Sequence, residues 1–222
     1  MNALLRYHWA LLLRSYRWLP PLILYAVFLA IGVQYGQPVL DGLGYTAAAV
    51  LPVTAWLVRA VVTMEPVGAR HCVAAARGGQ RAHLAGLLVA GQAGVVLGLA
   101  GVLATVAVSD PHSTVGQVPV RPLTALPAGV LATLVCVLLG LAVGALCNRP
   151  VLRGPGWPVP ATMLAALLVL VPSGSPANAA VTGLVTGSRD GTVDLPWLPL
   201  LIALGAAGAV TAGVAALVTR RG

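Results

Sequence analysis

The sequence contains no lysine, and this absence limits the chemistry that the chain can carry out. All 13 of its basic residues are arginine. A phosphate-binding loop of the form G-x-x-x-x-G-K-[ST] needs a lysine to reach the nucleotide phosphates, so the chain has no ATP-hydrolysing loop of this kind. If the protein performs work driven by ATP, we expect a separate subunit to hydrolyse it.

Charged residues of either sign are scarce. Only 8% of the 222 residues are charged, whereas 59% are hydrophobic, and the mean hydropathy is +0.93. A soluble domain cannot hide this much apolar surface in its core, so the composition predicts an integral membrane protein. The bias towards Ala, Gly, Val, Leu and Arg is typical of a GC-rich bacterial genome.

Potential metal ligands are few and poorly spaced. The cysteines are odd in number, show no C-x-x-C spacing and are interpreted as packing residues; they are Cys72, Cys136 and Cys147. The histidines lack the H-x-x-x-H or H-E-x-x-H spacing of a zinc site; they are His8, His71, His83 and His112. We therefore expect no metal and no cofactor in this chain.

Apolar segments long enough to approach the span of a membrane recur along the chain. A hydrocarbon core of about 30 Å needs about 20 mostly apolar helical residues, and shorter segments are tolerated through tilt or local thinning. Six segments qualify, the fifth of them short: about 19–35, 46–62, 84–108, 123–147, 157–171 and 196–218. The sequence thus predicts an all-α membrane protein that forms a single transmembrane domain over 1–222.

Arginine is distributed unequally between the predicted loops. Cytoplasmic flanks and short loops of membrane proteins retain positive charge. With the N-terminus inside, only Arg121 and Arg189 fall outside, together with four aspartates, Asp41, Asp110, Asp190 and Asp194. Glu65 is then the only cytoplasmic acid. We predict that both termini lie in the cytoplasm, and that the protein is a multi-pass protein of the bacterial plasma membrane.

The N-terminal residues 1–18 carry a helical pattern of their own. A helical projection places Arg6, Arg14 and Arg17 in one sector and most leucines on the other side, with Trp9 and Trp18 at the borders. This pattern predicts an amphipathic helix on the inner membrane leaflet, where each arginine near anionic lipid contributes about 1 kcal/mol. Membrane anchoring alone and additional contact with a cytoplasmic partner both remain open.

The predicted spans contain almost no ionisable side chains. Secondary transporters and proton-driven machines place carboxylates or imidazoles at membrane depth, because coupling needs a group that changes its charge there. Only Arg59 lies in a predicted span, near the cytoplasmic end, from which its side chain can reach the interface. No Ser/His or paired-Asp arrangement occurs at that depth, so we expect a non-catalytic chain.

Small and polar residues inside the spans predict contacts between helices. Gln92 is the only amide well within a span, and it is interpreted first as an interhelical hydrogen-bonding group. Gln92 and Thr54 are also candidates for lining a substrate cavity. Spacings that predict close helix packing are Ala90, Gly94 and Gly98; Gly140 and Gly144; and Gly205, Ala209 and Gly213.

One polar window, TMEPVGARHCVAAARGGQRAHLAG at 63–86, interrupts the apolar chain. Pro66 suits the first position of a helix, Glu65 suits its cap, and Gly78 and Gly79 end it. We predict a cytoplasmic helix over about 65–79. It is either a solvated loop helix positioned by lipid phosphates or a docking element for a soluble subunit, whose contacts would be Glu65, Arg70, His71, Arg77 and Arg81.

These features together resemble the permease subunits of ATP-binding cassette exporters of the type-two class. The stretches that carry the resemblance are ALLRYHWALLLRSYRWLPPLILYAVFLAIG, MEPVGARHCVAAARGGQRAHLAGLL and, loosely, VPSGSPANAAVTGL. The resemblance implies that 65–77 is the coupling helix that engages the ATPase, and that 175–185, in the outer segment 172–195, forms short helices that dip back from the outer surface. The E-x-x-x-G-T pattern frequent in that family reads EPVGAR here.

The function that this resemblance implies is that of a non-catalytic exporter permease. Its partners would be ATP-binding cassette ATPase subunits that carry ATP and Mg²⁺, a second permease of the same or a sister chain, and membrane lipids, but no nucleic acid. The alternatives are a membrane scaffold or immunity-type protein that binds a partner without transport, and a membrane enzyme. The A-R-G at 76–78 also resembles the coupling helices of vitamin-uptake transmembrane subunits.

Overall fold

Most of the described chain is helical, which confirms the predicted all-α fold. The structure is a computed structural model that describes residues 1–115, 118–120, 122–148 and 158–221. Only two isolated bridges and no strand occur within these ranges. The helices are α1 Asn2–Arg14, α2 Leu19–Gly32, α3 Val39–Met64, α4 Val67–Arg77, α5 Gly79–Val108, α6 Pro122–Cys147, α7 Pro158–Leu170, α8 Pro176–Asp190 and α9 Trp197–Arg221.

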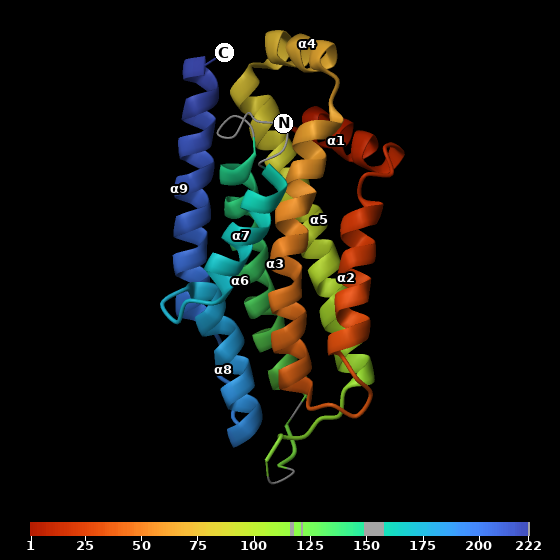
Figure 1. Cartoon of the computed structure of the whole chain (residues 1–222), viewed down its shortest axis with the longest axis vertical. Coiled ribbons are helices and arrows are strands. Elements are labelled where there is room, and N and C mark those ends of the chain that lie inside the picture. The colour runs from red at the N-terminus through yellow and green to blue at the C-terminus, as the bar shows by residue number, and fades with distance from the viewer. Residues whose placement is uncertain (116–117, 121, 149–157, 222) are drawn as a thin grey trace.

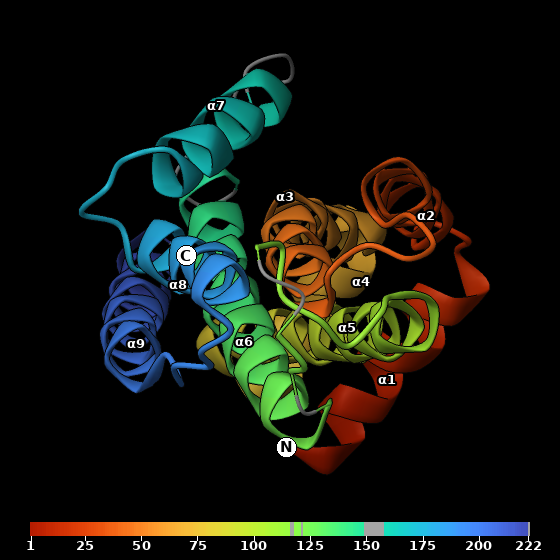
Figure 2. The same cartoon turned by 90° about the horizontal axis from the view of Figure 1, so that it is seen from below.

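The centre of the bundle is formed by α3 and α6, which pack against each other with α5 beside both (Figures 1 and 2). Of the most apolar stretch of each helix, 67% is buried in α3 and α6, but only 22% in α9. The core between them is almost entirely aliphatic, with Leu43, Val50 and Val135 among its members. The peripheral helices therefore present most of their apolar side chains outwards.

Glycine allows the central helices to approach each other closely. A Cβ atom added at Gly140 would lie 2.5 Å from the backbone oxygen of Leu51, and one added at Gly144 would lie 2.6 Å from Cβ of Val58. At Gly94 of α5, an added Cβ would lie 2.7 Å from Oγ1 of Thr54. These predicted packing positions are used within the chain.

The third predicted packing face is not used within the chain. An added Cβ at Gly205 or Gly213 of α9 would meet nothing within 4 Å. The prediction that this spacing marks a close contact between helices is therefore wrong within the single chain. The physical reason is position, since α9 lies at the edge of the bundle (Figure 2), and small residues permit a close approach without enforcing one.

Four helices, α3, α5, α6 and α9, are long and apolar enough to cross a membrane. A fifth crossing results if α1 and α2, which meet at a bend of 71°, are counted together. The predicted span 157–171 corresponds to α7, which has 13 residues and a length of about 20 Å, less than a hydrocarbon core. The expected first span, 19–35, ends early at Gly32, and the expected second span, 46–62, is longer than predicted, since α3 begins at Val39.

The predicted outer segment 172–195 folds into a single helix, α8. The Ser175 side chain caps this helix by accepting a hydrogen bond from the backbone N–H of Ala177 at 3.2 Å. Gly191 ends it with φ of +69°, a conformation that favours glycine. In Figure 1, both chain termini and α4 lie at one end of the bundle, the α4 end, whereas the far end of α8 and residues 109–115 lie at the opposite end, the α8 end.

Candidate partner-docking site

A short helix, α4, crosses the end of the bundle between the long helices α3 and α5 (Figure 1). It begins at Val67, later than the predicted 65, because Glu65 is extended with φ of −82° and ψ of 124°. The physical cause is Pro66, whose ring disfavours the helical conformation in the residue before it. Glu65 therefore ends α3 instead of capping α4.

The other end of α4 is a one-residue turn. Gly78 has φ of +84°, and α5 begins at the next residue, Gly79. A residue with a side chain rarely adopts this backbone conformation, so glycine is what allows so abrupt a reversal. Because almost no flexible linker joins α4 to either neighbour, a force applied to α4 acts directly on α3 and α5.

Arginine side chains are exposed around α4. Arg77, in the last turn of α4, and Arg81, near the start of α5, both face solvent in the isolated chain. Arg77 also stabilises α4, since a cation interacts favourably with the negative end of a helix. Arg70 and His71 belong to α4, but their side chains lie outside the described residues. Cys72 on the same helix is exposed.

Glu65 contacts another part of the same chain. The Tyr7 hydroxyl on α1 donates a hydrogen bond to its carboxylate. Burial, followed by this hydrogen bond and the negative charge of Glu65, raises the pKa of Tyr7 above its ordinary value. The only acid predicted for this side of the membrane thus joins α1 to the corner between α3 and α4.

Three further hydrogen bonds, donated by two side chains, hold α1 and the segment after it against the long helices. The Arg17 guanidinium donates to the Thr63 backbone oxygen at 2.8 Å and to its hydroxyl at 3.3 Å. The Trp9 indole donates to the Gln92 side-chain oxygen at 2.9 Å. The first contact reaches the end of α3 and the second reaches α5, so α1 acts as a brace across the α4 end.

The predicted helix over 1–18 is shorter in the structure, since α1 ends at Arg14 and leaves Arg17 and Trp18 beyond it. Within α1, the two sides differ as the helical projection predicts. Leu4, His8 and Leu12 are buried against the bundle, whereas Arg6 and Arg14 are exposed. Trp18, which follows α1, is half-buried, and its indole donates to the Leu13 oxygen at 3.4 Å. This amphipathic helix therefore uses its leucine side to pack on the protein and leaves its arginine side free.

The two candidate cavity-lining residues occupy different environments. Gln92 has the interhelical hydrogen bond to Trp9, which matches the first interpretation of its amide. Thr54 of α3 is fully buried against α5 and α6, where it contacts the Gly94 and Gly140 positions. Its hydroxyl donates a hydrogen bond to the Val50 oxygen of the same helix at 2.9 Å. Within the single chain, both side chains hold helices together.

Removing the Tyr7 hydroxyl should loosen this brace. We expect Tyr7→Phe to lower stability by about 1 kcal/mol, because the Glu65 carboxylate loses a hydrogen-bond donor, and to increase amide hydrogen exchange in α1. Tyr16→Phe is the matched control, since Tyr16 is exposed and no hydrogen bond of its hydroxyl is seen among the described residues. Equal protection of α1 in the two variants would show that the Tyr7–Glu65 contact does not hold it.

Comparison with known proteins identifies no relative: no protein-family model, curated protein or solved structure matches the chain.

Proposed function

We propose that the chain is the permease subunit of an ATP-driven exporter, and that it docks a separate ATPase through α4. The observation that carries this proposal is the position of α4, which lies across the end of the bundle, is joined almost without linker to α3 and α5, and is flanked by exposed arginines. An ATPase that binds α4 and moves would tilt both long helices. ATP and Mg²⁺ are held by that partner.

The distribution of charge supports a cytoplasmic location for the α4 end. Arg14, Arg17, Arg77 and Arg81 belong to segments at this end. The four aspartates lie at the start of α3, after α5, at the end of α8 and after α8. Retention of arginine on the cytoplasmic side gives this orientation. Arg121, Arg149 and Arg153 lie outside the described residues.

Six crossings are compatible with the arrangement of the helices. α7 and α8 follow each other along the bundle in Figure 1, so together they can cover the thickness that α7 alone does not. In this proposal the crossings are α2, α3, α5, α6, α7 with α8, and α9, and both termini are cytoplasmic. The bend between α1 and α2 then leaves α1 at the inner leaflet, with its exposed arginines near lipid phosphates.

One face of α3 supports a translocation path shared with a second permease. Nearly all of α3 is buried except a single face with residues at intervals of three or four, here called the α3 stripe: Tyr45, Ala48, Pro52, Trp56, Arg59 and Thr63. Arg59 reaches the Asn148 oxygen at 3.4 Å. The outward residues of α2, by contrast, include Ile23, Val27 and Ile31.

A face with an arginine fits a protein-lined path better than contact with acyl chains, because ionisable groups are costly in lipid. We infer that the α3 stripes of two permeases, of the same or a sister chain, face each other across the path. Binding and release of the ATPases would then expose this path alternately to the two sides of the membrane.

Cys72 provides a test of the docking site. Because it is exposed on α4 while Cys136 and Cys147 are buried, a membrane-impermeant maleimide should label it selectively in inside-out vesicles. We expect an ATP-hydrolysing subunit to co-purify with the tagged chain in mild detergent and to protect Cys72 from labelling. A scaffold or immunity-type protein would instead yield a partner without ATPase activity, and that result would overturn the exporter proposal.

A further inference from the structure

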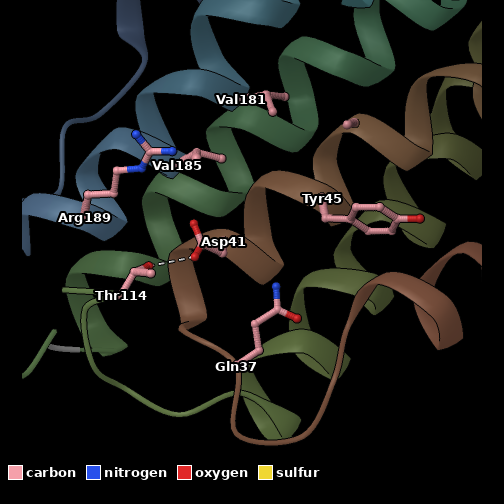
Figure 3. A pocket seen from close by; sticks show the side chains of 8 residues that line it. Gln37, Asp41, Tyr45, Thr114, Val181, Val185 and Arg189 are labelled. Carbon is pink, nitrogen blue, oxygen red and sulfur yellow. Dashed lines mark hydrogen bonds between the residues drawn. The ribbon is translucent and has the colours of Figure 1, made fainter. Parts of the chain in front are cut away.

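A pocket of about 450 Å³ opens at the α8 end of the bundle, away from the docking site (Figure 3). It lies between the first turns of α3, one face of α8 and the segment that follows α5. The residues that line it are Gln37, Asp41, Tyr45, Ala48, Thr114, Val181, Val185 and Arg189. These side chains include one carboxylate, one guanidinium and several apolar groups.

The carboxylate of this pocket is held in place by a chain of hydrogen bonds. The Thr114 hydroxyl donates to Asp41 Oδ2 at 2.8 Å, as Figure 3 shows, and lies 2.8 Å from the Ser188 hydroxyl of α8. The Thr114 backbone N–H also donates to the Ser188 oxygen at 2.8 Å. Asp41 lies in the first turn of α3, where the helix dipole stabilises its negative charge.

The guanidinium comes from the opposite wall. Arg189 lies in the last turn of α8, where the helix dipole stabilises a cation, and it is exposed. Although Asp41 and Arg189 line the same pocket, no ion pair joins them within 4.0 Å in the described chain. Two opposite charges are thus available to a ligand that bridges them.

The apolar groups lie on the side of the pocket nearer the middle of the bundle. Val181, Val185 and Arg189 follow one another at intervals of four on α8, so they share one face. On α3, Ala48 lies one turn beyond Tyr45 and two turns beyond Asp41, and the α3 stripe continues from there. The close approach of the helices occurs at Gly44, where an added Cβ would lie 3.4 Å from Val185 Cγ2.

We propose that this pocket binds the head group of a zwitterionic amphiphile, with its primary ammonium at Asp41 and its phosphate at Arg189. An ammonium group can donate hydrogen bonds to the carboxylate, and a guanidinium can bind phosphate through two parallel donors. The tail would lie along the valines and the start of the α3 stripe. Phosphatidylethanolamine has this chemistry. The inference goes beyond the docking of an ATPase and does not depend on it.

Ligands with different head groups test the contributions of the ammonium, the phosphate and the tail separately. A choline head group carries a quaternary ammonium that cannot donate a hydrogen bond to Asp41. A glycerol head group leaves the phosphate without any cation to balance Asp41. A free phosphoethanolamine molecule retains both charges but lacks the tail, so it distinguishes a soluble zwitterion from a membrane lipid.

The test measures binding of short-chain lipids to the purified full chain in a neutral maltoside detergent by titration calorimetry. We expect dihexanoyl phosphatidylethanolamine to bind about tenfold more tightly than the phosphatidylcholine and phosphatidylglycerol analogues, because each lacks one charge-assisted contact. Free phosphoethanolamine should bind at least about tenfold more weakly than the lipid, because it buries no tail.

Asp41→Asn and Arg189→Gln should each weaken binding of phosphatidylethanolamine by about tenfold. Asp190→Asn is the matched control, because Asp190 is an exposed charge next to Arg189 that does not line the pocket, and it should bind as the unmodified chain does. Val185→Phe fills the pocket and retains both charges, so it should abolish binding. This variant tests the pocket independently if Asp41→Asn does not fold.

Three results would overturn the proposal. Unchanged binding in Asp41→Asn and Arg189→Gln would show that neither charge recognises the head group. Equal affinity for the three lipids would show that the pocket does not recognise the primary ammonium group. Equal affinity for free phosphoethanolamine and the lipid would show that the pocket binds a soluble zwitterion and would exclude a membrane lipid as its ligand. None of these results would affect the ATPase proposal, which Cys72 labelling tests at the other end of the molecule.

Discussion

Replacing Arg77 and Arg81 with Glu is expected to remove most of the stimulation of ATP hydrolysis that the proposed permease would give its partner ATPase. Both side chains are exposed beside the turn at Gly78, where a docked subunit would meet them. Each charge-assisted hydrogen bond across such an interface contributes about 1.5–3 kcal/mol, so loss of two, with repulsion in their place, should lower stimulated hydrolysis by at least about tenfold. The measurement is ATPase activity in reconstituted vesicles.

The matched control is the double substitution with Lys, which retains both charges and removes only the paired donors of the guanidinium. We expect an intermediate loss of stimulation. Maleimide labelling of Cys72 in vesicles without the ATPase should be the same in all three proteins, which shows that α4 remains exposed and the chain correctly inserted. Full stimulation by the Glu variant would rule out docking through these arginines.

Replacing Gly140 with Val is expected to destabilise the bundle by about 3 kcal/mol or more, at the upper end of the cost of overpacking. The added Cβ would lie 2.5 Å from the Leu51 backbone oxygen, which cannot move away as the end of a flexible side chain can. α3 and α6 would have to separate along their central contact. Unfolding of the detergent-solubilised protein, followed by circular dichroism, measures the loss.

Gly208→Val on α9 is the control for this substitution. An added Cβ there would meet nothing within 4 Å, and the residue type and helix environment are otherwise similar. We expect the stability of this variant to stay within about 0.5 kcal/mol of the unmodified chain, as for surface substitutions away from special features. Equal destabilisation of the two variants would show that valine in a membrane helix, and not the α3–α6 contact, causes the effect.

Local features of α4 were predictable from the sequence. Pro66 and the glycine pair Gly78 and Gly79 mark the ends of a polar segment between apolar ones, and helix formation there depends on neighbours in sequence. The role of Glu65 was not predictable in the same way. Its contact is with Tyr7 on a different helix, and a hydrogen bond between distant segments leaves no periodicity in the chain.

The pocket at the α8 end was also not predictable from the sequence, because it too depends on contacts between distant segments. Asp41 and Arg189 each fit the ends of their own helices, and nothing in their sequence positions indicates that they line one cavity. Thr114, which comes from a third segment, joins Asp41 of α3 to Ser188 of α8, the residue before Arg189. The predicted topology places Asp41 on the outer side of the membrane with the other aspartates, but it does not predict which residues surround Asp41.

The glycine spacings show most clearly the difference between what the sequence determines and what the tertiary structure decides. Gly140 and Gly144 have the same four-residue spacing of small residues as Gly205, Ala209 and Gly213. The first pair lies against α3, whereas Gly205 and Gly213 meet no other part of the described chain within 4 Å. Composition and apolar segment length determined by themselves that this is a helical protein with several candidate membrane spans, because transfer of apolar residues from water depends on the residues alone. The contacts of Glu65, Asp41 and the glycines were decided only by the tertiary structure, because they depend on which helices become neighbours.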